Sequence, residues 1–235
     1  MMQPDSTPIR MPTAPEAGRV EQRRMWFVVG TMLLGAAWSF AGSYMGGGWK
    51  SASVIVAIIF GLYVVYIARY RNAVLGRLLL VAITAGFAEL LADRWLVDST
   101  GTLFYVPGEP LLVRSPVYMP FAWSNVLVAL AYLGSRIAER WSIAIACVAL
   151  ALFGAVYIPA YEYWANGSGW WTYRNTAAIG AAPFYIILGE FLIVLAMPIA
   201  ARYALRLSAA WSIAIGVVVG LWIWAAYAIA FAVAR

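Results

Sequence analysis

Seven long apolar stretches follow one another along the chain, separated by short polar segments. Each is close to the roughly 20 residues that a helix needs to cross the hydrocarbon core of a bilayer. The stretches cover residues 25–44, 51–67, 78–97, 117–133, 141–161, 177–200 and 207–233. The pattern predicts an all-α polytopic membrane protein, with one seven-helix transmembrane domain over residues 25–235.

The N-terminal segment differs from the rest of the chain. Residues 1–24 are rich in Pro, Thr, Glu and Arg and show no apolar period, which predicts a disordered cytoplasmic tail. Arg23 and Arg24 then precede an apolar stretch longer than a signal-peptide core, without a recognisable cleavage site. We therefore expect this stretch to be retained as the first helix.

Composition supports a membrane protein and narrows its chemistry. Hydrophobic residues make up 64% of the chain and charged residues 11%, whereas soluble domains carry roughly 25% charged residues. We attribute the net charge of +6 to basic loop residues that orient the protein in the bilayer, and we expect no nucleic-acid partner. With no histidine and a single cysteine, Cys147, the chain offers almost no ligands for haem, zinc or copper. We expect no cofactor and no metal, although carboxylates alone leave a Mg²⁺ site open.

The basic residues predict how the chain lies in the membrane. With the N-terminus inside, the cytoplasmic segments hold Arg19, Arg23, Arg24, Arg69, Arg71, Arg77, Arg136, Arg140, Arg202 and Arg206. The opposite side holds only Lys50, Arg94, Arg114, Arg174 and Arg235. Because cytoplasmic loops carry an excess of basic residues, we expect a bacterial plasma-membrane protein with its N-terminus inside and its C-terminus outside.

Four carboxylates lie in the outer half of the predicted bundle. Glu89 and Asp93 are four residues apart in the stretch 78–97, so that they share a helix face, while Glu162 and Glu190 belong to the fifth and sixth stretches. Ionisable groups in a membrane span are costly and mark functional sites. The alternative is that they pair with Arg94, Arg174 or buried hydroxyls and only fix the packing of the helices.

Aromatic residues crowd the same side, around the two long loops 98–116 and 165–176. An interfacial belt of Trp and Tyr accounts for some of them, but less well for their concentration on one face. We expect a pocket there whose wall includes Tyr105, Tyr118, Trp123, Asn125, Trp171, Tyr173 and Tyr185.

A sequence pattern around these residues occurs twice. The first copy reads Glu89-x-x-Ala92-Asp93, Gly101-x-x-x-Tyr105 and Pro116-x-Tyr118; the second reads Glu162-x-x-Ala165-Asn166, Gly169-x-x-x-Tyr173 and Pro183-x-Tyr185. The pattern predicts two helical hairpins, formed by the third and fourth and by the fifth and sixth stretches. Parallel repeats of this kind place a site at the interface between the repeats.

An acid in an aromatic-lined apolar pocket favours a particular chemistry. A carboxylic acid that stays neutral is a good general acid, and it can protonate an alkene or epoxide. The faces of Trp and Tyr then attract the carbocation that forms. Motifs for other chemistries are absent: there is no aspartate-rich diphosphate motif, no nucleophile with a His base, no GxGxxG and no P-loop.

The acid-bearing helix before Thr100-Gly101 and Tyr105, together with Glu162, Gly169-Trp170-Trp171-x-Tyr173 and Gly180-x-x-Pro183, resembles membrane carotenoid-modifying proteins. These are the carotenoid hydratases and the small membrane lycopene cyclases; the membrane terpene cyclases of meroterpenoid pathways are similar in size and in their buried acids. The resemblance covers roughly residues 80–190 and implies that Glu89 and Glu162 are the family's acids. Asp93 and Glu190 have no secure counterpart, and Tyr185-Ile-Ile-Leu-Gly189-Glu190 replaces the hydratases' Asn-Phe-x-Gly-Trp segment.

The leading hypothesis is therefore a membrane enzyme that protonates a lipophilic isoprenoid and so cyclises or hydrates it. In this hypothesis Glu89 is the general acid, Asp93 supports it, and Glu162 and Glu190 deprotonate or stabilise the cation. Two alternatives remain. In a proton-coupled transporter, Glu89 and Glu190 relay protons, and in a non-catalytic assembly subunit the acids are structural.

Overall fold

The computed structural model describes residues 14–234, and within this range it contains seven long helices. They are α1 (Ala14–Met45), α2 (Gly48–Tyr70), α3 (Ala73–Trp95), α4 (Met119–Arg140), α5 (Ile143–Gly167), α6 (Phe184–Arg206) and α7 (Ala209–Ala234). All seven are long and apolar enough to cross a membrane. The predicted class, an all-α integral membrane protein with seven spanning helices, is confirmed.

Helix α1 begins well before the predicted first span. It starts at Ala14, so that residues 14–24, expected in the disordered tail, are helical. The reason lies in Glu21, whose carboxylate accepts a hydrogen bond from Tyr132 and lies 2.9 Å from Arg136, both on α4. This contact ties the extended end of α1 to the bundle. The remainder of the predicted tail, residues 1–13, lies outside the described residues, as does Arg235.

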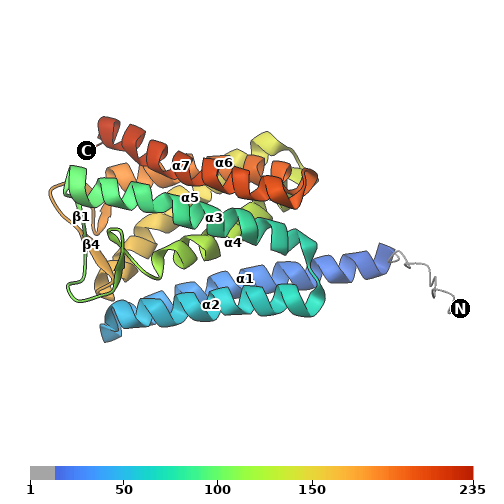
Figure 1. Cartoon of the computed structure of the whole chain (residues 1–235), viewed down its shortest axis with the longest axis horizontal. Coiled ribbons are helices and arrows are strands. Elements are labelled where there is room, and N and C mark those ends of the chain that lie inside the picture. Colours follow the sequence, from blue (N-terminus) through green and yellow to red (C-terminus); the bar gives the residue numbers. More distant parts are fainter. Residues whose placement is uncertain (1–13, 235) are drawn as a thin grey trace, which may run out of the picture.

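The helices form a bundle of five with a pair along its side (Figure 1). Helix α3 packs against α4 and α7, and α6 packs against α5 and α7, while α1 and α2 lie side by side along the bundle. The described end of α7 lies at the end of the molecule that carries strands β1 and β4, whereas α1 begins at the opposite end.

Two glycines bring α7 unusually close to α3. A Cβ atom at Gly216 would lie 2.6 Å from the carbonyl oxygen of Val81, and one at Gly220 would lie 2.7 Å from that of Ala85. Their spacing of four puts both glycines on one face of α7, the small-xxx-small pattern that lets membrane helices approach closely. The contact presses α7 onto the face of α3 beside Glu89.

Short strands connect the helices at the end where α7 finishes. After α3 and the π-helical turn Leu96–Thr100, the first loop contains β1 (Leu103–Tyr105), β2 (Leu111–Leu112) and β3 (Ser115–Pro116). The second loop contains β4 (Trp171–Tyr173), β5 (Ala178–Ile179) and β6 (Ala182–Pro183). Each loop thus has one strand followed by a hairpin, and β1 pairs with β4 in an antiparallel ribbon. The repeat of helical hairpins stays a prediction.

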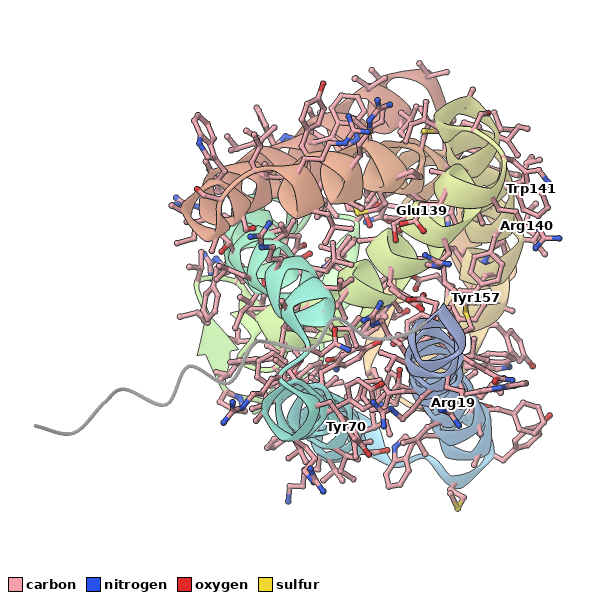
Figure 2. All side chains as sticks on the ribbon, turned by 90° about the vertical axis from the view of Figure 1, so that its right-hand side faces the viewer. Arg19, Tyr70, Glu139, Arg140, Trp141 and Tyr157 are labelled. Carbon is pink, nitrogen blue, oxygen red and sulfur yellow. The ribbon has the colours of Figure 1, made fainter. Side chains whose placement is uncertain are left out.

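The opposite end of the bundle carries many of the arginines. Arg69, Arg140 and Arg206 lie in the last turns of α2, α4 and α6, and these helices all end on that side. Figure 2 shows this end of the molecule, with Arg19, Tyr70 and Arg140 labelled. These three arginines, which the orientation rule assigns to the cytoplasm, are therefore grouped at one end.

Candidate functional site

A cavity lies beneath the β1–β4 ribbon. The ribbon forms its outer wall. Side chains alternate between the two faces of a strand, and in this ribbon Leu103, Tyr105, Trp171 and Tyr173 line the cavity. Phe104 lies between Leu103 and Tyr105 and so belongs to the other face of the ribbon. The Arg174 guanidinium lies 4.9 Å from the centre of its ring.

Three of the four predicted carboxyl groups line this cavity, each from a different helix: Asp93 from α3, Glu162 from α5 and Glu190 from α6. All three residues are buried. Each carboxyl accepts a hydrogen bond from an aromatic side chain. The donors are the Tyr105 hydroxyl to Asp93, Trp171 Nε1 to Glu162 at 2.7 Å, and the Tyr227 hydroxyl to Glu190 at 2.7 Å.

None of these three carboxyls forms an ion pair with a residue in the described part of the chain. Arg94, expected as a partner under the packing alternative, lies 3.8 Å from Asp98 instead. Arg174 lies over the ring of Phe104. Neither arginine pairs with these acids, but the Tyr105 and Tyr227 hydroxyls are partners of the second kind that this alternative names, so the packing alternative stays open. The side chains that donate to the three acids are neutral aromatic groups.

Glu89 occupies a different position from its neighbour Asp93. It is completely buried, and in the described part of the chain neither of its carboxyl oxygens has a hydrogen-bond partner. It is not among the residues that line the cavity. Helix α7 packs against its backbone, where a Cβ at Gly220 would lie 3.1 Å from the Glu89 nitrogen. The structure thus places Asp93 at the cavity and Glu89 one turn behind it.

The predicted wall residues divide into three groups. Trp123, like the three ribbon aromatics Tyr105, Trp171 and Tyr173, lines the cavity. Tyr118 and Tyr185 stand behind the wall; the Tyr185 hydroxyl is 2.7 Å from the Thr102 hydroxyl. Asn125 lines a second cavity. The ribbon tyrosines act as neutral donors, since burial raises the pKa of Tyr105 and of Tyr173 well above the usual value.

The sequence reasoning missed Tyr157, Tyr161 and Tyr227, which complete the wall. The first two are four residues apart on α5, and Tyr161 directly precedes Glu162, a spacing that could have indicated them. Tyr227 had a weaker signal, because it belongs to the most uniformly apolar helix. It approaches α6 at Gly189, where a Cβ would lie 2.8 Å from Tyr227 Cε1.

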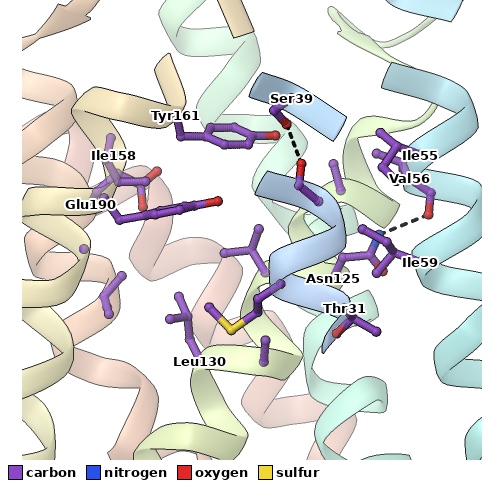
Figure 3. A pocket seen from close by; sticks show the side chains of 18 of the residues that line it. Thr31, Ser39, Ile55, Val56, Ile59, Asn125, Leu130, Ile158, Tyr161 and Glu190 are labelled. Atoms are coloured by element: carbon purple, nitrogen blue, oxygen red, sulfur yellow. Dashed lines mark hydrogen bonds between the residues drawn. The ribbon is translucent and has the colours of Figure 1, made fainter. Parts of the chain in front are cut away.

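A second cavity adjoins the first, between the α1–α2 pair and helices α4–α6 (Figure 3). Glu190 and Tyr161 line both cavities. Within residues 14–234 there is no group of three or more His, Cys, Asp or Glu residues placed to hold a metal ion.

Comparison with known proteins identifies a family but not an activity. The model of a family described as "Domain of unknown function (DUF6989)" matches residues 90–234, more than half of the chain, so the chain belongs to this family. No curated protein and no solved structure matches it. The matched region contains the three cavity-lining acids and begins immediately after Glu89.

Proposed function

We propose that this member of the DUF6989 family is a membrane enzyme that protonates a lipophilic isoprenoid and thereby cyclises or hydrates it. One observation carries the proposal: three buried carboxyls line one aromatic cavity, each held by an aromatic donor, and none forms an ion pair within residues 14–234. A substrate dissolved in the bilayer suits a site inside such a bundle.

Asp93 is the group we assign as the general acid. It faces the cavity, and Tyr105 donates to one of its oxygens, so that the other oxygen is left to carry the reactive proton. Transfer of this proton to an alkene forms a C–H bond and leaves a carbocation on the adjacent carbon; transfer to an epoxide opens the C–O bond with the same result. Glu89, one turn behind, supports Asp93.

Two outcomes follow from the cation. In a cyclisation, a second double bond closes the ring, and loss of a proton from carbon to Glu162 or Glu190 gives an isomer. In a hydration, water adds to the cation and then loses a proton. In both cases the faces of Trp123, Tyr157 and Tyr173 stabilise the cation, each by up to about 2 kcal/mol when water is excluded.

The proposal also includes an orientation in the membrane. We place the arginine-bearing end of the bundle in the cytoplasm of a bacterial cell, with the N-terminus inside and the C-terminus outside. The β1–β4 ribbon and the cavity beneath it then face the outer half of the bilayer.

The decisive experiment is mass spectrometry of lipid extracts from hosts that make carotenoids and other polyprenoids, with and without the gene. A new isomer of unchanged mass would indicate a cyclase, and the gain of one water would indicate a hydratase. We expect Asp93→Asn to lower product formation at least ~100-fold, the usual scale of general acid catalysis. Glu162→Gln and Glu190→Gln should also lower it.

The matched control is Asp98→Asn, which changes a carboxylate that is ion-paired with Arg114 and lies outside the cavity. It should leave product formation unchanged. Unaltered lipids in every isoprenoid background, with protein present in the membrane, would refute the proposal. Uptake driven by a pH gradient in proteoliposomes would then point to a carrier.

A further inference from the structure

The two cavities share a wall that separates them only in part. Six residues line both: Ala122, Val126, Tyr157, Ile158, Tyr161 and Glu190. Val126 is 38% exposed, although it lies on the cavity side of α4. A ligand in one cavity therefore reaches the other beside Val126 and Glu190, and this point is the passage between the two cavities.

The second cavity is long and mostly apolar. On α1 its lining runs from Thr31 to Ser39, which corresponds to roughly 12 Å along a helix. Ile55 and Ile59 of α2 and Leu130 of α4 complete much of the wall (Figure 3). These walls suit a hydrocarbon chain rather than a compact polar molecule.

Two polar atoms in this apolar lining have no hydrogen-bond partner among residues 14–234. Asn125 donates through Nδ2 to the carbonyl oxygen of Val56 at 3.1 Å, and its Oδ1 accepts nothing. Trp170 is 2% exposed, and its Nε1 donates to nothing. Buried polar atoms without partners are costly and call for an explanation. A hydroxyl group both donates and accepts, so it satisfies either atom.

We propose that the two cavities form a single site for an elongated polyprenoid that carries a hydroxyl group. The reacting double bond lies near Asp93, and the rest of the chain lies in the second cavity, where Asn125 accepts from the hydroxyl and Trp170 donates to an oxygen. The placement of the double bond rests on the proposed function, whereas the binding of the chain does not. Helices α1 and α2, which lie outside the matched family region, supply one wall and select the ligand.

Binding to the purified full-length protein in detergent tests this inference without catalysis. The probes are radiolabelled geranylgeraniol, its methyl ether and the shorter alcohol geraniol. The ether keeps the oxygen acceptor but has no hydrogen to donate. The variants are Asn125→Leu, Trp170→Phe and Val126→Phe, which remove the acceptor, remove the donor and narrow the passage, respectively.

We expect the unmodified protein to bind geranylgeraniol roughly ten-fold more tightly than the ether, the usual effect of one buried hydrogen bond. Asn125→Leu should abolish this preference. Trp170→Phe should lower the affinity for the alcohol and for the ether by a similar factor. Val126→Phe should lower the affinity for geranylgeraniol strongly but that for geraniol little, because the shorter chain fits within one cavity.

Two control variants keep these results interpretable. Trp38→Phe removes an indole whose N–H already bonds to Ser51, and Val148→Phe enlarges an exposed side chain on α5; neither residue lines a cavity, and neither change should alter affinity. If Val126→Phe does not fold, Ala122→Leu narrows the same passage.

Equal affinity for alcohol and ether in the unmodified protein, or a preference that survives Asn125→Leu, would overturn the hydroxyl assignment. Unchanged geranylgeraniol binding in a folded Val126→Phe protein would overturn the joined site. Binding as expected with no new lipid product in cells would refute only the proposed enzyme.

Discussion

Glu109, in the first loop and outside the membrane-spanning helices, makes the stability of the protein depend on pH. It is 7% exposed, and its Oε1 accepts a hydrogen bond from the Val106 amide at 2.8 Å, while Oε2 has no partner. Burial raises the pKa of its carboxyl to about 7, although the Val106 bond opposes the rise. The loop therefore holds Glu109 more easily as the neutral acid.

The sign of the effect follows from linkage. Because the folded pKa of Glu109 lies above the unfolded one, its stabilising contribution is complete below about pH 4.5 and is lost as the pH rises through about 7. We expect Glu109→Gln to increase stability above pH 7, by on the order of 1 kcal/mol since the loop lies near solvent. Thermal melts of both proteins at pH 5 and pH 8 check this. An equal difference in melting temperature at both pH values would contradict it.

Single residues also show what the sequence could and could not predict about the site. Carboxylates in apolar stretches are conspicuous, so Asp93, Glu162 and Glu190 could be found from the sequence alone. Their hydrogen-bond partners could not, because Tyr227 meets Glu190 across two helices, and the meeting depends on how α6 and α7 pack. Asp93 lines the cavity and Glu89 does not, a difference that a four-residue spacing likewise cannot indicate.

At the scale of elements, the close approach of α3 and α7 gives a direct prediction. A Cβ at Gly216 or Gly220 would collide with backbone atoms of α3, which cannot rotate away. We expect Gly216→Ala and Gly220→Ala each to cost about 1–3 kcal/mol, as overpacking usually does. Gly220→Ala should also displace α3 beside Glu89.

The control for this prediction is Gly61→Ala on α2, where an added Cβ would meet nothing within 4 Å. There the better helix propensity of alanine should raise stability slightly. Melting temperatures in one detergent compare the three variants. Gly216→Ala and Gly220→Ala proteins as stable as the Gly61→Ala protein would show that α7 does not need its glycines.

Elements also differ in how well the sequence predicts them. The seven spans follow from length and hydropathy, because the bilayer imposes both. The strands could not be predicted, since β2, β3, β5 and β6 have two residues each, too few for an alternating pattern. The early start of α1 depends on the contact of Glu21 with α4, which hydropathy does not register.

At the scale of the whole molecule, the orientation can be tested with single cysteines. The only native cysteine, Cys147, is buried. We expect Leu112→Cys, in the hairpin near the ribbon, to react with a membrane-impermeant maleimide in intact cells. Arg140→Cys, at the opposite end, should react only after the cells are made permeable. The reverse pattern of labelling would show that the ribbon faces the cytoplasm.

The β1–β4 ribbon has a further consequence, for the order of assembly during synthesis. Its strands flank α4 and α5, so β1 must wait, unpaired, until both helices and β4 have left the ribosome and inserted. Contacts between segments distant in the chain form late. The ribbon is therefore completed only after five helices are in the membrane, and the cavity beneath it only after α6 and α7 bring Glu190 and Tyr227. A nascent chain arrested before β4 would hold Asp93 and Glu162 in a bundle without its outer wall.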